Sequence, residues 1–544
     1  MSKVSSGFDA VTLEVLWTRL ISATDEAAAA LVRTSFSTLV RESYDFSCVI
    51  TDQFGRSLVQ ATQSIPSFIG TLPRTVKHFL REFPADKLAP GDVIITNDMF
   101  EGTGHLPDIT VGKPIFYKGR LIGFTASTAH APDIGGKIRS PEPREIFEEG
   151  LQIPTMKLID VGKVDETLVR IIRKNVRTPD ETMGDLWAQL VALDVMEART
   201  IALLEDTGLE HLDELAAEIH GRCESAMRTA ISKLPDGTYT SALDIDGAYD
   251  HGLRLEMALT VKGEEIDIDF AGSSPQVDRA INVAMCFTFA QTVYGLKCLL
   301  TPTLPNNEGS FLPITVRAPE GCILNPRFPA SGGSRMLTGH FLGTLVLKAL
   351  AGILPRAVMA DPGSPHWGIN QSGVRNGKPY ANMLFYNGGM GATAQRDGLS
   401  CVGWPGNVAY TPIELSEHIT PFQIRRKELS ADSGGPGEFR GGLGQDIELQ
   451  NRSETPIAVS FLSEHILHPP FGTQGGAPAP CGRIEINGEV AHPKRQHVLK
   501  QGDVIRLLIP GGGGYGDPQK RDAALIEEDL KQGYVVDTRP YRGT

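Results

Sequence analysis

The apolar positions near the start of the chain recur with the period of an α-helix. Leu13, Leu16 and Leu20 lie three or four residues apart, and an alanine-rich stretch after them continues the pattern. This spacing places apolar side chains on one helix face. Because alanine and leucine also favour the helical backbone, we predict a helix over about residues 12–36.

Two β-hairpins are predicted between the helical stretches. Residues 45–51 and 56–60 form the first, with a turn sequence between them. Residues 109–116 and 120–128 form the second, because both runs are rich in β-branched and apolar side chains and are joined by Lys118-Gly119. The N-terminal part of the chain therefore combines helices with antiparallel strands.

The second half of the chain has a different composition. Glycine and proline become more frequent after residue 236, and strand patterns dominate. Ile266, Ile268 and Phe270 alternate with two aspartates, as expected for a strand with one buried face. Helices with β-hairpins in the first half, followed by a β-rich second half, are typical of the α+β class.

The length of 544 residues exceeds one ordinary hydrophobic core and predicts about three domains. Residues 180–204 and 212–232 predict two further helices before the change in composition. We therefore predict a multidomain α+β protein: an N-terminal α+β domain with β-hairpins (1–236), a mixed α/β middle domain (237–410) and a β-rich C-terminal domain with a glycine-rich loop (411–544).

The second hairpin brings potential metal ligands together. If the residues on either side of Lys118-Gly119 pair directly, His130 lies opposite Pro107 and is flanked by His105 and Asp108. Two neutral imidazoles and one carboxylate, with positions left for water or substrate, suit a catalytic divalent metal. A polar loop could also lie beside a strand end by chance, since scattered histidines are common in a long chain.

Two nearby features favour the metal site over chance. A second polar cluster, Asp133-Ile134-Gly135-Gly136, follows His130. Glycines 102 and 104 let the loop that contains His105 bend around a ligand. Asp45 and Glu42, close to the start of the first hairpin, are candidate additional ligands or bases. Each could instead be a helix-capping or turn carboxylate.

Charge and cysteine content narrow the class of protein. The formal net charge is −13, which disfavours a nucleic-acid partner because such surfaces are normally basic. The seven cysteines are dispersed and without C-x-x-C spacing, as expected for reduced thiols in a cytoplasmic protein. Residues 1–8 show no export signal, and residues 341–354 predict a buried helix too short to span a membrane.

Several other kinds of site have no matching motif. The chain has no P-loop, no G-x-S-x-G elbow and no H-E-x-x-H. The glycine run at residues 511–514 is expected to be a turn or packing loop, since neither a lysine nor a clear helix follows it. Glu464, His465 and His468 form a competing metal-like cluster, which we interpret as a loop after a strand because Pro469 follows directly.

A series of motifs along nearly the whole chain resembles the hydantoinase B/oxoprolinase family. The matching segments are Arg41-Glu42-Ser43-Tyr44-Asp45-Phe46-Ser47, Asn97-Asp98, Gly104-His105-Leu106-Pro107-Asp108, His130-Ala131-Pro132-Asp133-Ile134-Gly135-Gly136, Glu149-Gly150-Leu151-Gln152-Ile153-Pro154, Asp432-Ser433-Gly434-Gly435-Pro436-Gly437, Arg440-Gly441-Gly442-Leu443-Gly444 and the stretch from Pro510 to Pro518. One position departs from the pattern: Phe68 stands where many members have a histidine, which removes or replaces that histidine's role.

The resemblance implies a B-type subunit of an ATP-dependent cyclic-amide hydrolase. Its substrate would be a hydantoin, N-methylhydantoin, lactam or 5-oxoproline, and an A-type partner would use ATP and Mg²⁺ to phosphorylate the amide oxygen. A hetero-oligomer such as A2B2 is expected. This division of labour agrees with the missing P-loop. Neither a nucleic acid nor a membrane is expected among the partners.

The resemblance also assigns roles to the candidate residues. His105, Asp108 and His130, with Asp45, would hold a divalent zinc, manganese or iron ion that acidifies water. Glu42, Asp133 and Glu149 are candidate catalytic bases, and the sequence does not rank them. Asp133 could instead orient His130.

Three alternatives stay open at this point. Acetone and acetophenone carboxylases have related subunits, although those known to us tend to be longer. Two histidines and a carboxylate also describe the facial triad of a mononuclear iron oxygenase, although the spacing here is H-x-x-D. A structural metal in a non-catalytic scaffold would show four protein ligands and no exchangeable position.

Overall fold

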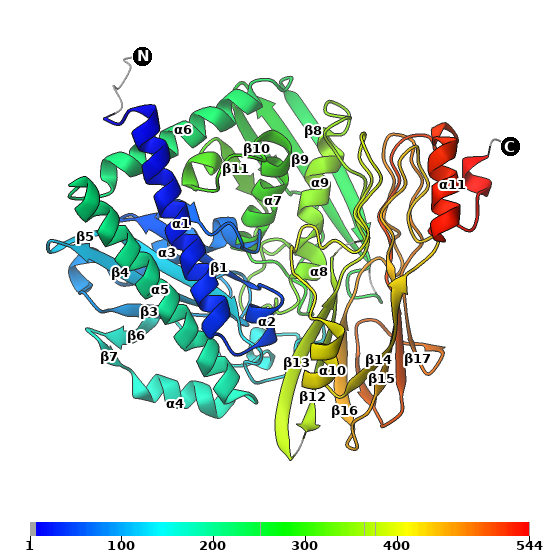
Figure 1. Cartoon of the computed structure of the whole chain (residues 1–544), viewed down its shortest axis with the longest axis horizontal. Coiled ribbons are helices and arrows are strands. Elements are labelled where there is room, and N and C mark those ends of the chain that lie inside the picture. The colour runs from blue at the N-terminus through cyan, green and yellow to red at the C-terminus, as the bar shows by residue number, and fades with distance from the viewer. Residues whose placement is uncertain (1–6, 251, 364, 376, 543–544) are drawn as a thin grey trace.

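A seven-stranded sheet forms the centre of the N-terminal half of the molecule (Figure 1). The computed structural model describes residues 7–250, 252–363, 365–375 and 377–542. Residues 1–6, part of the segment examined for an export signal, lie outside the described residues. The strand order is β2-β1-β5-β4-β3-β6-β7. The strands are β1 (Phe46–Asp52), β2 (Ser57–Gln60), β3 (Val93–Thr96), β4 (Asp108–Tyr117), β5 (Arg120–His130), β6 (Met156–Asp160) and β7 (Lys163–Val164).

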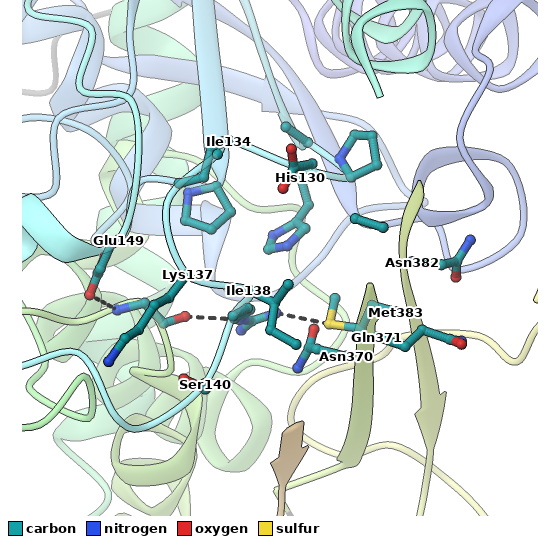
Figure 2. Close-up of a pocket in the computed structure, with 18 of the residues that line it drawn as sticks. His130, Ile134, Lys137, Ile138, Ser140, Glu149, Asn370, Gln371, Asn382 and Met383 are labelled. Carbon is teal, nitrogen blue, oxygen red and sulfur yellow. Dashed lines mark hydrogen bonds between the residues drawn. The ribbon is translucent and has the colours of Figure 1, made fainter. Parts of the chain in front are cut away.

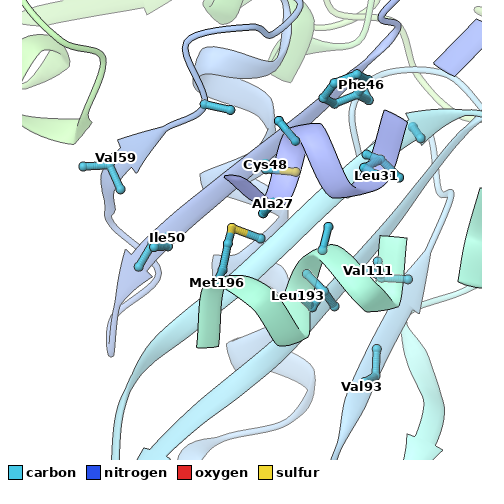
Figure 3. Packing of buried hydrophobic residues seen from close by; sticks show 14 of the residues in the cluster. Ala27, Leu31, Phe46, Cys48, Ile50, Val59, Val93, Val111, Leu193 and Met196 are labelled. Atoms are coloured by element: carbon cyan, nitrogen blue, oxygen red, sulfur yellow. The ribbon is translucent and has the colours of Figure 1, made fainter. Parts of the chain in front are cut away.

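Helices cover both faces of this sheet. Helices α1 (Ala10–Thr34) and α5 (Pro179–Thr207) lie on one face, where Cys48 and Ile50 of β1 pack between them (Figure 3). Helix α3 (Phe68–Glu82) covers the opposite face, towards which the intervening Val49 points. The alternation of strand side chains thus builds two apolar layers from one sheet.

The predicted helices and hairpins of this half are confirmed. The predicted helices 12–36, 180–204 and 212–232 correspond to α1, α5 and α6 (Asp213–Ile231). Both predicted hairpins are present, as β1 with β2 and β4 with β5. The short helices α2 (Thr38–Arg41) and α4 (Glu166–Asn175) complete this half.

A four-stranded sheet and three helices follow. The sheet has the order β11-β10-β9-β8, and its alternating strand is confirmed, because Ile266 and Ile268 are buried whereas Asp267 and Asp269 are only half-buried. Its elements are β8 (Gly237–Ile245), β9 (Leu253–Lys262), β10 (Glu265–Asp269), β11 (Ile314–Arg317), α7 (Met285–Leu300), α8 (Met336–Gly339) and α9 (Phe341–Leu350). Helix α9 is the predicted buried helix.

Two further sheets enclose a third core towards the C-terminus. Their orders are β13-β12-β16-β19 and β14-β15-β20-β17-β18, and Trp367, Phe461 and Ile505 pack between them. The elements are β12 (Trp367–Arg375), β13 (Lys378–Tyr386), β14 (Phe422–Leu429), β15 (Gln445–Asn451), β16 (Ile457–Leu462), β17 (Arg483–Ile486), β18 (Glu489–Val490), β19 (Gln496–Leu499), β20 (Val504–Leu508), α10 (Ile413–Ile419) and α11 (Ala523–Gln532).

The predicted α+β class is confirmed, whereas the exact boundaries after residues 236 and 410 stay predictions. None of the helices in the described part of the chain combines the length and apolarity needed to cross a bilayer. All seven cysteines are free thiols.

The glycine run at residues 511–514 is a packing loop within a buried layer of backbone segments. Gly512 donates a backbone hydrogen bond to Gly442 and accepts one from Gly435. A Cβ atom built at Gly512 would lie 2.0 Å from the carbonyl oxygen of Met390. Since glycine alone allows such close approach of backbones, the run holds neighbouring segments together.

Candidate metal centre

Three adjacent strands bring Asp45, His130 and Asp108 into one row. Asp45 directly precedes β1, and its carbonyl oxygen accepts a hydrogen bond from the His130 backbone N–H, 3.0 Å away. His130 ends β5, where its direct partner on β4 is Asp108. Because β1, β5 and β4 are neighbours in the sheet, all three side chains lie at the same end of these strands.

The predicted pairing of His130 with Pro107 is wrong by one residue. The turn is as predicted, with Tyr117 paired with Arg120 and with positive φ at both Lys118 (48°) and Gly119 (80°). The register shifts between Ile115 and Phe116, where a β-bulge adds one residue to β5. The bulge is the physical reason why His130 faces Asp108 itself.

His105 completes the cluster from the loop that precedes β4. Its Nε2 lies 2.7 Å from Asp108 Oδ1, and His130 Nδ1 lies 3.0 Å from the same oxygen. Asp45 Oδ2 is 3.9 Å from His130 Nδ1. Among the described residues, His105, Asp108 and His130 form the one group whose ligand atoms all lie within 4.8 Å of one another.

The side chains around the cluster orient its ligand atoms. Asp108 Oδ2 accepts hydrogen bonds from Thr103 Oγ1 at 2.6 Å and from an Arg335 guanidinium nitrogen at 2.9 Å. Its other oxygen therefore faces the two histidines. The His105 Nδ1 lies 3.1 Å from the Gly333 carbonyl oxygen, and donation to that oxygen leaves Nε2 as the ligand nitrogen.

Burial and charge set the protonation of these groups. Burial, together with the positive charge of Arg335, holds the pKa of His105 well below its usual value. Burial alone would raise the pKa of Asp108, but His105 and Arg335 hold it well below its usual range. Burial and the neighbouring Asp108 charge raise the pKa of Asp45. A divalent cation would offset the cost of these buried carboxylates.

The residues present fit a divalent metal. His105 Nε2 is buried and has no hydrogen-bond partner although it lies close to Asp108 Oδ1. An unpaired ring nitrogen facing a carboxylate oxygen is costly without a cation between them. Imidazole and carboxylate donors suit zinc, manganese or iron.

Replacing either histidine should empty the site. We expect His105→Ala and His130→Ala each to lower the metal content of the purified chain from about one ion to a small fraction, because each removes a primary donor. Elemental analysis after gel filtration measures this. Ala substitution of His211, which lies outside the cluster, is the control, and full metal content in both site variants would contradict the ligand assignment.

A pocket opens beside the cluster (Figure 2). Its empty volume of about 600 Å³ includes open solvent at its mouth. His130 and Arg139 line both this pocket and a second cavity around the ligands. Glu149 lies on one side, and Asn370 and Met383 from the β12–β13 hairpin lie on another (Figure 2). The pocket is therefore built from both halves of the chain.

Glu149 is the candidate base with the most suitable surroundings. Its Oε1 accepts hydrogen bonds from the backbone N–H groups of Gly332 (2.8 Å) and Gly333 (2.7 Å), while Oε2 is buried without a partner. Burial raises its pKa to about 7 despite these two donors. A carboxylate with a pKa near neutrality can take up and release a proton at physiological pH.

The other two predicted bases lie in different settings. Asp133 lines the pocket, but its Oδ1 is 2.7 Å from an Arg177 guanidinium nitrogen and its Oδ2 accepts from the Arg177 backbone. Its carboxylate is held by Arg177. Glu42 follows the last turn of α2, half-buried, and lines neither the pocket nor the adjoining cavity.

The competing cluster at residues 464–468 is a structural loop, as expected. Glu464 forms a buried ion pair with Lys494. His465 Nδ1 lies 2.7 Å from the His468 carbonyl oxygen, and Asp246 accepts hydrogen bonds from three backbone N–H groups of this loop. These contacts hold the loop against the middle of the chain.

The cavity around the ligands contains two histidines that the sequence did not indicate. His340 and His366 have ring centroids 5.2 Å apart, and burial, with the nearby arginines, lowers the pKa of His340 to about 3. Phe68 lines the same cavity. The cavity wall is therefore apolar at Phe68, and the imidazoles of His340 and His366 come from segments far away in the sequence.

Some residues of the site could not be predicted from the sequence, because only long-range contacts bring them there. Arg139, Arg335, His340 and His366 are single polar residues without local spacing. The glycine pair Gly332-Gly333 between two serines was the one local signal that backbone groups approach something closely there. It could not indicate which side chain they meet.

Comparison with known proteins identifies the family. The family model for hydantoinase B/oxoprolinase matches residues 9–518. A protein of Pseudomonas sp. (strain NS671), provisionally named as the B-type subunit of a D-/L-hydantoinase, is 31% identical over 98% of this chain and 95% of its own length. The chain therefore belongs to the hydantoinase B/oxoprolinase family.

Solved structures share the fold. The crystal structure of the ATP-dependent caprolactamase from Pseudomonas jessenii matches with a TM-score of 0.88 and 29% identity, over 97% of this chain and 95% of that one. Nucleotide-free acetone carboxylase also gives a TM-score of 0.88, at 20% identity, over 98% of this chain and 79% of that one. At that identity, the second likeness shows the fold alone.

Proposed function

We propose that the chain is the hydrolytic, metal-dependent subunit of an ATP-dependent cyclic-amide hydrolase, whose substrate is a hydantoin, a lactam or 5-oxoproline. The observation that carries the proposal is the convergence of His105, Asp108 and His130 next to a pocket that also contains Glu149. Membership of the hydantoinase B/oxoprolinase family supports the substrate class. An A-type partner carrying the ATP and Mg²⁺ site is part of the proposal.

The chemical problem is the stability of an unstrained amide. Attack by water disrupts the amide resonance and expels a poor nitrogen leaving group, so activation has to come first. The partner would phosphorylate the amide oxygen, which makes the carbon a better electrophile. The present chain would then complete ring opening in the pocket beside the candidate metal ligands.

Different residues of this chain would bind the metal and accept the proton. Asp45, His105, Asp108 and His130 would hold the metal, which when bound lowers the pKa of a coordinated water towards ~7. We propose Glu149 as the general base, because its unpartnered Oε2 is held at the pocket wall by the Gly332 and Gly333 amides. Its buried position excludes bulk water from competing for the proton.

Reconstitution tests the proposal. The chain is combined with an A-type subunit and supplied with ATP, Mg²⁺ and a panel of hydantoins, lactams, 5-oxoproline, and ketones with bicarbonate. ATP-dependent ring opening by the complex, with no ATP turnover by the chain alone, is the expected result. Carboxylation of a ketone would assign the chain to the carboxylases instead, and oxygen uptake on substrate addition would indicate an oxygenase.

The base assignment predicts a pH dependence. Only the ionised Glu149 can accept a proton, and its pKa is raised to about 7. We therefore expect kcat/KM for ring opening to fall as the pH drops below about 7. In Glu149→Gln this acidic limb should disappear and the rate should fall about 10²- to 10⁴-fold. An unchanged pH profile in the variant would exclude Glu149 as the base; Glu148→Gln is the neighbouring control.

A further inference from the structure

Arg139 has no carboxylate partner although it lines the pocket. Its Nε donates to the Gly333 carbonyl oxygen at 2.8 Å, and one terminal nitrogen lies 3.4 Å from the Met383 sulfur. No ion pair within 4.0 Å involves it among the described residues, whereas Arg177 and Arg335 pair with Asp133 and Asp108. A guanidinium has five donors, so most of those on Arg139 remain for a ligand.

Charge balance in the site also favours an anionic ligand. Three buried carboxylates, Asp45, Asp108 and Glu149, face two guanidiniums, Arg139 and Arg335. When a divalent cation is bound, the positive charges outnumber the negative ones. Excess charge away from water is costly, and an entering anion neutralises it.

A basic cleft adjoins the mouth of the pocket. Lys137 lines both the pocket and this cleft, where Arg144, Arg279 and Arg495 gather with only Glu142 and Asp250 as acidic residues. Arg144 and Arg279 form no ion pair among the described residues. In a chain with a net charge of −13, this local excess of positive charge attracts anions to the pocket.

We propose that Arg139 binds an oxyanion of the substrate, namely the phosphoryl group of the activated amide. The planar fork of a guanidinium matches two phosphate oxygens and binds them through paired hydrogen bonds. The inference rests on the proposed function, because ATP-dependent activation supplies the phosphoryl group. A substrate carboxylate, such as that of 5-oxoproline, is the other source of an oxyanion.

Titration calorimetry with inorganic phosphate tests the proposal on the purified full chain. We expect Arg139→Met to weaken phosphate binding about tenfold or more, since charge-assisted hydrogen bonds are lost. Arg139→Lys, which keeps the charge without the fork, should give an intermediate affinity. Arg317→Met, which removes an exposed arginine on β11, should leave it unchanged. Melting temperature and metal content are measured for every variant.

Three results would overturn the proposal. The first is that the wild-type chain does not bind phosphate, and the second is that Arg139→Met binds phosphate as tightly as the wild type. The third is that the wild type binds acetate as tightly as phosphate, which would indicate a carboxylate ligand. If Arg139→Met does not fold, an unchanged affinity in Arg139→Lys is decisive. The phosphate experiment needs neither ATP nor a partner, so its failure is distinguishable from failure of the proposed function. Phosphate binding can persist if the complex proves inactive on cyclic amides, and it can fail if the complex is active.

Discussion

In Asp108→Asn, ring opening by the reconstituted complex is expected to fall more than about 100-fold, beyond the range typical of residues outside the ligand set. Asparagine keeps the shape of the side chain but removes the negative charge that both histidines and Arg335 face. Phosphorylation by the proposed A-type partner should continue, because its ATP site would lie on another chain. Measuring ATP consumption beside ring opening in one reaction separates the two steps.

The matched control for this variant is Asp133→Asn. Asp133 is also a buried carboxylate paired with an arginine, but it lines the adjoining pocket and is not part of the ligand cluster. Equal losses in the two variants would attribute the effect to disturbed packing, and full ring opening in Asp108→Asn would remove Asp108 from the ligand set. Melting temperatures are needed for both, since each leaves an arginine without its partner.

Gly512→Ala should destabilise the fold by about 3 kcal/mol or more, the upper range for overpacked cores. The added Cβ would lie 2.0 Å from the Met390 carbonyl oxygen and 2.2 Å from its carbon. Both are backbone atoms, which cannot rotate away as a side chain does. Thermal or denaturant unfolding of the purified variant, or its loss to the insoluble fraction, measures the effect.

For Gly221→Ala, in contrast, we expect no loss of stability. Gly221 lies inside α6, and a Cβ there meets nothing within 4 Å. Since alanine favours the helical backbone by roughly 0.5–1 kcal/mol over glycine, this variant should be as stable as the wild type or more stable. If the two variants melt alike, close backbone packing does not explain the glycine run.

Local patterns predicted most of the elements that carry the ligands. The strands leading to His130 and away from Asp108 could be recognised from β-branched runs and a two-residue turn. The bulge in β5 opposite Ile115 and Phe116 could not be placed, because Gly112 in the regular part of β4 carries the same signal as Gly123 beside the bulge. It changed the partner of His130 by one residue but kept the ligands together.

The rest of the site depends on contacts that no local pattern encodes. Arg335 reaches Asp108 across 227 positions of sequence, and Glu149 meets the Gly333 amide across 184. Such pairings are decided by how the middle of the chain packs on the first sheet. Ranking Glu42, Asp133 and Glu149 as bases therefore required the three-dimensional structure.

The Gly333 peptide group ties three parts of the site together. Its N–H donates to Glu149, and its carbonyl oxygen contacts both His105 and Arg139. During synthesis on the ribosome, the four candidate metal ligands emerge well before Gly333. The sheet can therefore bring these four residues close together early, but Gly333 can orient His105, Glu149 and Arg139 only after the middle of the chain has been made.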